Sequence, residues 1–85
     1  MKTFDYTVTA ANGIHGRPAG NLVKLAGTFK STIIIKKGDV SNDLTMLMAV
    51  MSMGVRKGDT VTITIEGPDE QIAANAVEEF FKQNL

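Results

Sequence analysis

The segment Thr60–Ile65 alternates strictly between threonine and a β-branched apolar residue, reading Thr-Val-Thr-Ile-Thr-Ile. An alternation with a period of two places every apolar side chain on the same face of a β-strand. Such a strand is stable only when another layer of the protein covers that face. The segment therefore predicts a sheet that is buried on one side and open to water on the other.

Three further segments are expected to join this sheet. The apolar residues of Phe4–Ala10 alternate with polar neighbours, and Thr32–Lys36 is a run rich in β-branched residues. A turn at residues 37–39 is then expected to lead into a short strand, Val40–Asn42. Together with Thr60–Ile65, these segments make a sheet of four strands.

Three segments have the helical period instead, in which apolar residues recur every three or four positions. The first is expected to begin near Gly16 and to end near Gly27, with Pro18 in its first turn, where no N–H is needed. The second is expected at Leu44–Met53, and the third is expected to open at Gly67–Glu70. The third helix is expected to bury one stripe of side chains, Ile72, Ala73, Ala76, Val77 and Phe80.

The expected order of elements is therefore β-α-β-β-α-β-α. Because the strands have one apolar face, the three helices are expected to cover that face from a single side. We predict an α+β fold, a two-layer open-faced sandwich with a four-stranded, mostly antiparallel sheet. The 85 residues have room for one domain, which is expected to span residues 1–85.

Composition excludes several classes of function. Lys and Arg together number 9, as do Asp and Glu, so the net charge of zero disfavours a nucleic-acid-binding protein. The chain has no cysteine and one histidine, so we expect neither a metal site nor another cofactor. No apolar run reaches the length of a bilayer, and the start of the chain lacks a signal core. We therefore expect a cytoplasmic protein without membrane insertion.

The single histidine, His15, stands where the first helix is expected to begin. The free backbone N–H groups and the dipole of a helix N-terminus favour an anion there. Arg17 follows two residues later, and its planar guanidinium suits phosphate oxygens. These features predict that His15 is a nucleophile that receives a phosphoryl group, with the backbone of Gly16 and Arg17 and the Arg17 side chain as phosphate contacts. On the residues alone, a helix-capping or surface histidine stays an alternative.

The segment Gly13–Ala19, Gly-Ile-His-Gly-Arg-Pro-Ala, resembles the active-site signature of the HPr family, the histidine-containing phosphocarriers of the bacterial sugar phosphotransferase system. The resemblance covers the whole chain and includes the Leu47–Val55 segment and the Lys57–Val61 turn. It implies that enzyme I phosphorylates His15 on ring Nδ1, and that the group then passes to the A component of a sugar-specific enzyme II. The chain would then be a covalent phosphoryl carrier rather than an enzyme with its own turnover.

The methionine-rich second helix is a candidate docking surface. Exposed methionine side chains suit a surface that binds several partners, although a short helix can also bury them in the core. The resemblance implies that positions on both of the first two helices dock partners beside the histidine. The expected docking residues are Gly20, Lys24, Gly27, Leu47, Met48 and Met51.

Two positions depart from the family pattern. Many Gram-positive members open the second helix with a serine that a kinase phosphorylates, whereas this chain has Met46, which has no hydroxyl. The neighbouring hydroxyls of Thr45 and Ser41 are out of register, and helix capping is their expected role. Gly16 replaces a more frequent alanine or small polar residue, and it is expected to loosen the start of the first helix by about 0.5–1 kcal/mol.

Three functions are compatible with these residues. The first is a general sugar-system phosphocarrier, and the second is a regulatory module whose phosphorylation state controls a partner enzyme or transcription factor. The third is an interaction domain without phosphate chemistry. His15 and Arg17 together favour phosphoryl transfer. A monomer is expected, because a shuttle must expose one face to successive partners.

Overall fold

The sheet contains four strands in the order β1-β4-β2-β3. The computed structural model describes all 85 residues, and its strands are β1 (Lys2–Thr7), β2 (Thr32–Lys37), β3 (Val40–Asp43) and β4 (Thr60–Glu66). All three neighbouring pairs are antiparallel. The predicted four-stranded sheet is confirmed, and the strictly alternating segment forms one of its two inner strands.

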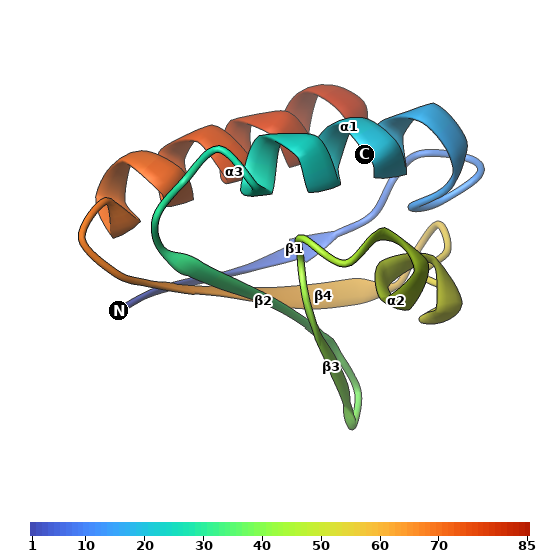
Figure 1. Cartoon of the computed structure of the whole chain (residues 1–85). Helices are drawn as coiled ribbons and strands as arrows, with labels where there is room; N and C mark the ends of the chain where they lie inside the picture. The colour runs from blue at the N-terminus through green and yellow to red at the C-terminus, as the bar shows by residue number, and fades with distance from the viewer.

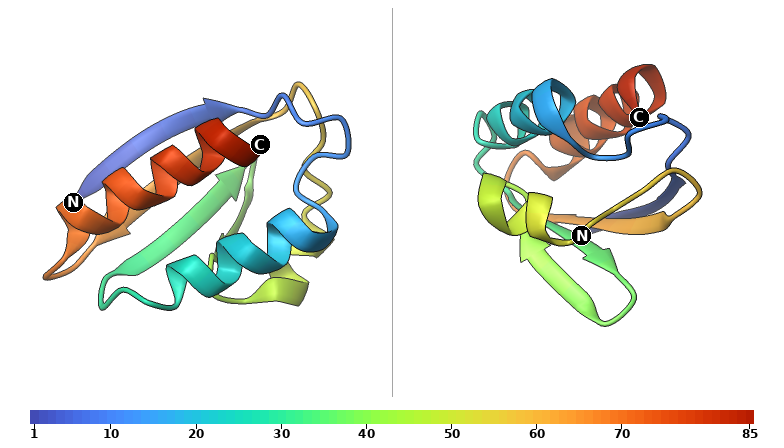
Figure 2. Two further views of the ribbon diagram at one scale, coloured as in Figure 1. Left: turned by 90° about the horizontal axis from the view of Figure 1, so that it is seen from above. Right: turned by 90° about the vertical axis from the view of Figure 1, so that its right-hand side faces the viewer.

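Three helices cover one face of this sheet. They are α1 (Gly16–Ala26), α2 (Leu47–Ser52) and α3 (Glu70–Asn84). Figure 1 shows α1 and α3 side by side above the sheet, and the short α2 lies on the same side near β3 (Figures 1 and 2). The predicted order of elements and the two-layer arrangement are confirmed. None of the helices combines the length and the apolar character needed to cross a membrane.

The core lies between the helices and the covered face of the sheet. Val61, Ile63 and Ile65 of β4 are fully buried, and so is Ile35 of β2, which pairs with Ile63. The residues between them point to the open face, where Thr62 donates a hydrogen bond to Asp5 of β1. The period of two in the sequence therefore gives the sheet one buried face and one solvent-exposed face, as expected.

Each helix adds a fully buried side chain to this core, namely Leu22 from α1, Val50 from α2 and Phe81 from α3. The ring of Phe81 contacts two aromatic rings of β1. Its centroid lies 6.1 Å from that of Phe4, in an edge-on arrangement, and 5.2 Å from that of Tyr6. These aromatic contacts attach α3 to the edge strand β1.

The predicted buried stripe of α3 is partly wrong. Ala73 and Val77 are buried as expected, but Ile72 is 66% exposed. Ala74 and Phe81 occupy the core instead. Residues 73, 77 and 81 are spaced four apart and share one face, so the docking of Phe81 on β1 rotates Ile72 out towards water.

The second helix begins at Leu47, three residues after the predicted start at Leu44. Asp43 explains the delay, because its carboxylate accepts hydrogen bonds from the backbone N–H of Thr45 at 2.8 Å and from the Thr45 hydroxyl at 2.6 Å. This side-chain turn gives the backbone an alternative to the helix. Leu44 is fully buried within that turn.

Candidate functional site

His15 is the residue that precedes the first turn of α1. Its backbone is extended, with φ −153° and ψ 153°, and its side chain makes no capping hydrogen bond to the helix. The residue is exposed to solvent. The side chain therefore does not cap the helix, and the alternative of an exposed surface histidine agrees with the structure.

Gly16 has a left-handed backbone, with φ +60°. A β-carbon at this position would meet no other atom within 4 Å, so the constraint is conformational rather than steric. An L-residue adopts this region only with strain, whereas glycine does so readily. The expectation that Gly16 loosens the start of the helix relative to alanine is therefore wrong, because at this backbone angle alanine is the strained residue. Gly16 allows the chain to change abruptly from the extended His15 to the helix.

Arg17 is exposed and forms neither of the two ion pairs of the chain, which join Met1 to Glu70 and Lys37 to Asp59. Pro18 lies in the first turn, as predicted, and supplies no N–H. The open end of α1 thus offers the amides of its first residues and an uncommitted guanidinium. Both are groups that bind phosphate oxygens.

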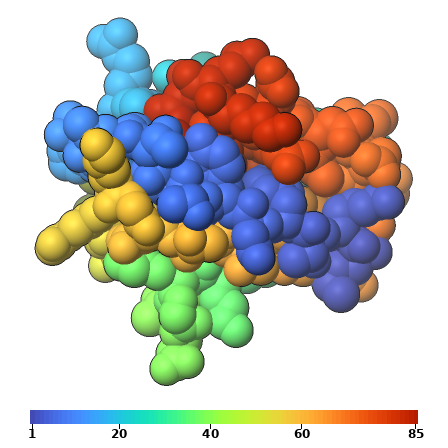
Figure 3. Space-filling view, turned by 180° about the vertical axis from the view of Figure 1, so that it is seen from behind, coloured from blue at the N-terminus to red at the C-terminus, as the bar shows by residue number.

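The loop before His15 is held in place by the turn at Val55. Gly13 has φ +67°, and a β-carbon on it would lie 2.1 Å from the Val55 carbonyl oxygen. The same oxygen accepts a hydrogen bond of 3.1 Å from the N–H of Ile14, whose side chain is buried. Figure 3 shows these two segments in contact, the loop in blue and the turn in yellow. Only glycine allows this close approach.

Sequence reasoning did not identify the residues that hold this turn. The Lys37 ammonium lies 2.9 Å from an Asp59 carboxylate oxygen and donates to the Gly54 carbonyl at 3.2 Å. The same carboxylate oxygen accepts the Arg56 N–H at 2.8 Å. The Arg56 N–H and the Lys37 ammonium together hold the pKa of Asp59 below its ordinary value. No sequence signal joins Lys37 to Asp59, because only the folded sheet brings the two segments together.

The predicted docking residues of α2 differ in exposure. Met48 is 77% exposed and Leu47 is 38% exposed. Met51 is half-buried and packs against the core, so its prediction as an outward residue needs correction. Met48 and Met51 are three residues apart and so lie near the same side of α2, but Met51 is also next to the fully buried Val50. Its side chain therefore lies between the exposed face and the core, which is why it is half-buried.

The remaining docking candidates lie on α1 and just beyond its end. Lys24 and Gly27 are exposed, and Gly20 is partly exposed. Their spacing of three and four residues places them on one side of the helix, in line with Arg17. Helices α1 and α2 contact each other. The structure thus brings the α1 candidates next to the helix that carries Leu47 and Met48.

Met46 immediately precedes α2 and is exposed, and no side chain caps the helix there. Thr45 donates its hydroxyl to Asp43 instead, and Ser41 lies within β3. The predicted capping role of Thr45 and Ser41 is therefore wrong. The reason is the Asp43 side-chain turn, which binds the Thr45 groups before the helix begins.

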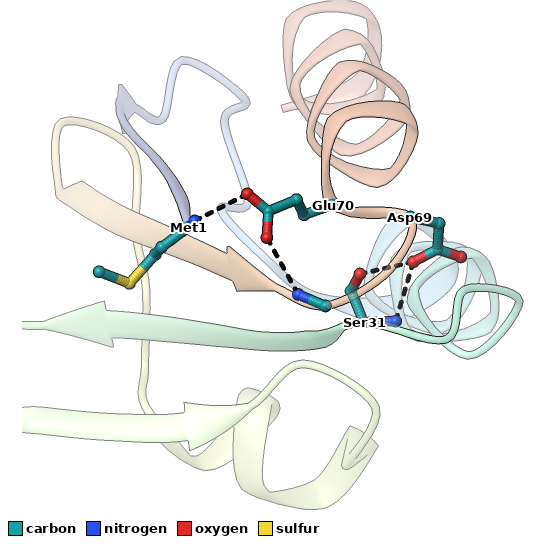
Figure 4. A network of polar contacts seen from close by, with 5 residues as sticks. Met1, Ser31, Asp69 and Glu70 are labelled. Carbon is teal, nitrogen blue, oxygen red and sulfur yellow. Dashed lines mark hydrogen bonds and ion pairs between the residues drawn. The ribbon is translucent and has the colours of Figure 1, made fainter.

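Two carboxylates of the protein itself, those of Asp69 and Glu70, lie at the N-terminus of α3, although neither side chain caps the helix. Asp69 accepts hydrogen bonds from the Ser31 N–H at 2.9 Å and from the Ser31 hydroxyl (Figure 4). It also accepts one from the Lys30 N–H at 2.8 Å. Glu70 accepts the Gly67 N–H at 3.2 Å and pairs with the terminal ammonium of Met1. The Ser31 hydroxyl and the Lys30 N–H lower the pKa of Asp69, and the Met1 ammonium and the Gly67 N–H lower that of Glu70.

Comparison with known proteins agrees with this geometry. Residues 2–83 match the family described as PTS HPr component phosphorylation site. The phosphocarrier protein HPr of Lysinibacillus sphaericus is 36% identical over 77 residues, which cover 91% of this chain and 88% of the relative. The structure of HPr-C-His from Thermoanaerobacter tengcongensis is similar with a TM-score of 0.94 at 31% identity, covering 98% of this chain and 93% of that one. An HPr dimer from the same organism matches with a TM-score of 0.78 at 31% identity, covering 98% and 95% of the two chains. This chain therefore belongs to the HPr family of phosphocarriers of the phosphotransferase system.

Proposed function

We propose that this chain accepts a phosphoryl group on His15 from enzyme I and passes it to the A component of a sugar-specific enzyme II. The observation that supports the proposal is the free imidazole of His15 at the open N-terminus of α1, with Arg17 unpaired beside it. The family to which the chain belongs is itself described by a phosphorylation site, which also supports the proposal.

The transfer uses the lone pair of a neutral imidazole nitrogen, which is Nδ1 by resemblance to the family. The lone pair attacks the phosphorus of the donor, a new N–P bond forms, and the bond to the donor breaks with its electron pair left on the donor. Transfer to the acceptor repeats the exchange in the opposite sense. The histidine therefore returns unchanged after each cycle.

The phosphorylated ring brings negative charge to the start of α1. The backbone N–H groups of Gly16 and Arg17 and the Arg17 guanidinium are the contacts we propose for it. Phosphoryl transfer depends mainly on alignment and on stabilisation of charge. A small exposed site is therefore sufficient when the partner supplies the other half.

Partners are proposed to dock on the surface formed by α1 and α2 beside His15. Met48 and Leu47 would supply its apolar centre, and Lys24 a charged rim, with Gly20 and Gly27 allowing close approach. Met51 would support this surface from below, because it packs against the core.

A monomer in the cytoplasm is the state that suits such a shuttle, because one face must meet several partners in turn. The HPr dimer of Thermoanaerobacter tengcongensis is an alternative state within the family. Light scattering at working concentration decides between the two for this chain. A stable dimer that covers His15 would contradict the proposed shuttle.

The direct test is phosphohistidine labelling. The purified protein is incubated with phosphoenolpyruvate, Mg²⁺ and enzyme I, and the product is analysed by mass spectrometry beside His15→Ala. We expect one acid-labile phosphoryl group on the wild type and none on the variant. An unlabelled wild type, next to a control carrier that is labelled in the same reaction, would exclude the proposed transfer and leave the interaction domain without phosphate chemistry.

A further inference from the structure

Lys37 and Asp59 connect three separate parts of the fold. Lys37 is the last residue of β2, and Asp59 immediately precedes β4. Their ion pair of 2.9 Å is about two-thirds shielded from solvent, with 33% and 31% of the two side chains exposed. The lysine also donates to the Gly54 carbonyl, just beyond α2. We name Lys37 and Asp59 the clamp.

The clamp fixes the turn at residues 54–59 from several directions. Asp59 accepts the Arg56 N–H through its side chain and donates its own N–H to the Arg56 carbonyl at 3.0 Å. The Gly58 N–H donates to the Val8 carbonyl at 2.7 Å, and the Val8 N–H donates to the Asp59 carbonyl at 2.9 Å. The turn is therefore attached both to the clamp and to the chain that leaves β1.

The same turn carries the surface against which the His15 loop rests. The Val55 carbonyl receives the Ile14 N–H, and Gly13 approaches this carbonyl too closely for any β-carbon. No other backbone hydrogen bond of Ile14 or Gly13 to a distant segment exists, since Gly13 donates only to Ala10 within its own loop. A displacement of the turn therefore displaces the residue directly before His15.

We propose that the Lys37–Asp59 ion pair is a positioning element for His15, which it holds at the start of α1 through the turn at residues 54–59. Neither residue touches the imidazole, so the effect is on placement rather than on chemistry. The proposed consequence for phosphoryl transfer rests on the proposed function of the chain. Because a misplacement of about 1 Å can slow a reaction by up to roughly 10²-fold, even a small shift of the turn has a measurable effect.

The test compares Lys37→Met and Asp59→Asn with Lys36→Met as the matched control. Lys36 lies next to Lys37 on β2, carries the same charge, and is exposed, and its side chain forms no hydrogen bond or ion pair. Lys37→Arg keeps the cation and serves as the rescue variant. His15 is the only histidine, so its ring signals in an NMR spectrum are assigned without ambiguity.

We expect the ring signals of His15 and the amide signal of Ile14 to move in Lys37→Met and Asp59→Asn. They should stay at the wild-type positions in Lys36→Met and return towards them in Lys37→Arg. The initial rate of phosphorylation by enzyme I should fall about three- to tenfold in the first two variants only. Unchanged His15 and Ile14 signals in folded Lys37→Met and Asp59→Asn would overturn the proposal, even if both variants melt at lower temperature. If the wild type itself accepts no phosphoryl group, the proposed function fails, and the NMR signals still decide whether the clamp positions His15.

Discussion

The two long helices of this protein, α1 and α3, differ in the charge at their N-termini. Asp69 and Glu70 lie at the start of α3, where they bind backbone N–H groups, a hydroxyl and the terminal ammonium of other segments rather than the N–H groups of the helix (Figure 4). Neither helix has a side-chain cap, but the first turn of α1 contains no acidic residue, whereas that of α3 contains Glu70. A helix N-terminus attracts negative charge in either case. The difference is that α3 receives this charge from its own chain, whereas α1 has none, as the proposed phosphoryl site requires.

The comparison extends to the glycine in front of each helix. Gly13 approaches Val55, and Gly67 approaches Ser31, where a β-carbon would lie 2.6 Å from two Ser31 atoms. Both helices are therefore set against another segment through a close glycine contact. At α3 the glycine contacts Ser31, which is hydrogen-bonded to Asp69. At α1 the glycine contacts Val55 and lies two residues before His15, whose side chain is exposed.

The largest effect is expected when a carboxylate is placed at the start of α1. In His15→Asp, the carboxylate can cap the first turn, so stability should increase by about 1 kcal/mol. Phosphohistidine should be lost completely, because the nucleophilic nitrogen is gone. Thermal melting and enzyme I labelling measure the two effects together. A variant no more stable than the wild type would show that the end of α1 is not an open anion site.

The next effect concerns the two glycines. Gly13→Ala and Gly67→Ala should each lose about 1–3 kcal/mol of stability, because the new β-carbon overlaps atoms of Val55 or Ser31. Denaturant unfolding measures this loss. Only Gly13→Ala should also slow phosphorylation of the folded fraction, since Gly67 lies at the other helix. Equal phosphorylation rates for the two variants would contradict the prediction that only the glycine near α1 affects the His15 site. Gly38→Ala, a left-handed glycine with no neighbour near its β-carbon, controls for backbone strain alone.

A smaller effect is expected on the stability of the protein when the pH is lowered. The pKa of Asp69 is lower in the folded protein than its ordinary value of 3.8, so its contribution to stability is complete above that value. The contribution disappears as the pH falls through the lower, folded pKa. Asp69→Asn should therefore melt at a lower temperature than the wild type at pH 7, and the difference should shrink below pH 3.8. Melting curves across this range check it, with Asp39→Asn, at an exposed hairpin residue, as the control. A difference independent of pH would exclude the charge of Asp69 as its cause.

The smallest effect separates two exposed apolar residues. Met48 lies on α2, beside α1, and Ile72 lies on α3, and both side chains are mostly in water. Met48→Ala should weaken enzyme I binding by about 1 kcal/mol or more, while Ile72→Ala should leave it unchanged. Both should alter stability by less than about 0.5 kcal/mol. Calorimetric titration of enzyme I measures the affinities, and an equal loss in both variants would remove the proposed docking role of α2.

The sequence predicted all seven elements of the fold but not all of their inward faces. The strict alternation of Thr60–Ile65 was sufficient for β4, because the period of a strand is a local property. In α3, the periodic pattern allowed either Phe80 or Phe81 to face the core. Phe81 faces the core because its ring contacts Phe4 and Tyr6. These contacts depend on how α3 packs against β1, which the sequence of α3 does not encode.

At the candidate site, the sequence by itself determined the proposed phosphoryl acceptor and its place at the start of a helix. His15, Arg17 and the start of α1 follow from residues that are adjacent in the chain, where capping and helix-dipole rules apply directly. The tertiary structure alone decided what holds that site in place. The Lys37–Asp59 pair depends on the strand register and on the turn geometry. Contacts between segments far apart in the chain are set by packing of the whole fold, and no local period of the sequence encodes them.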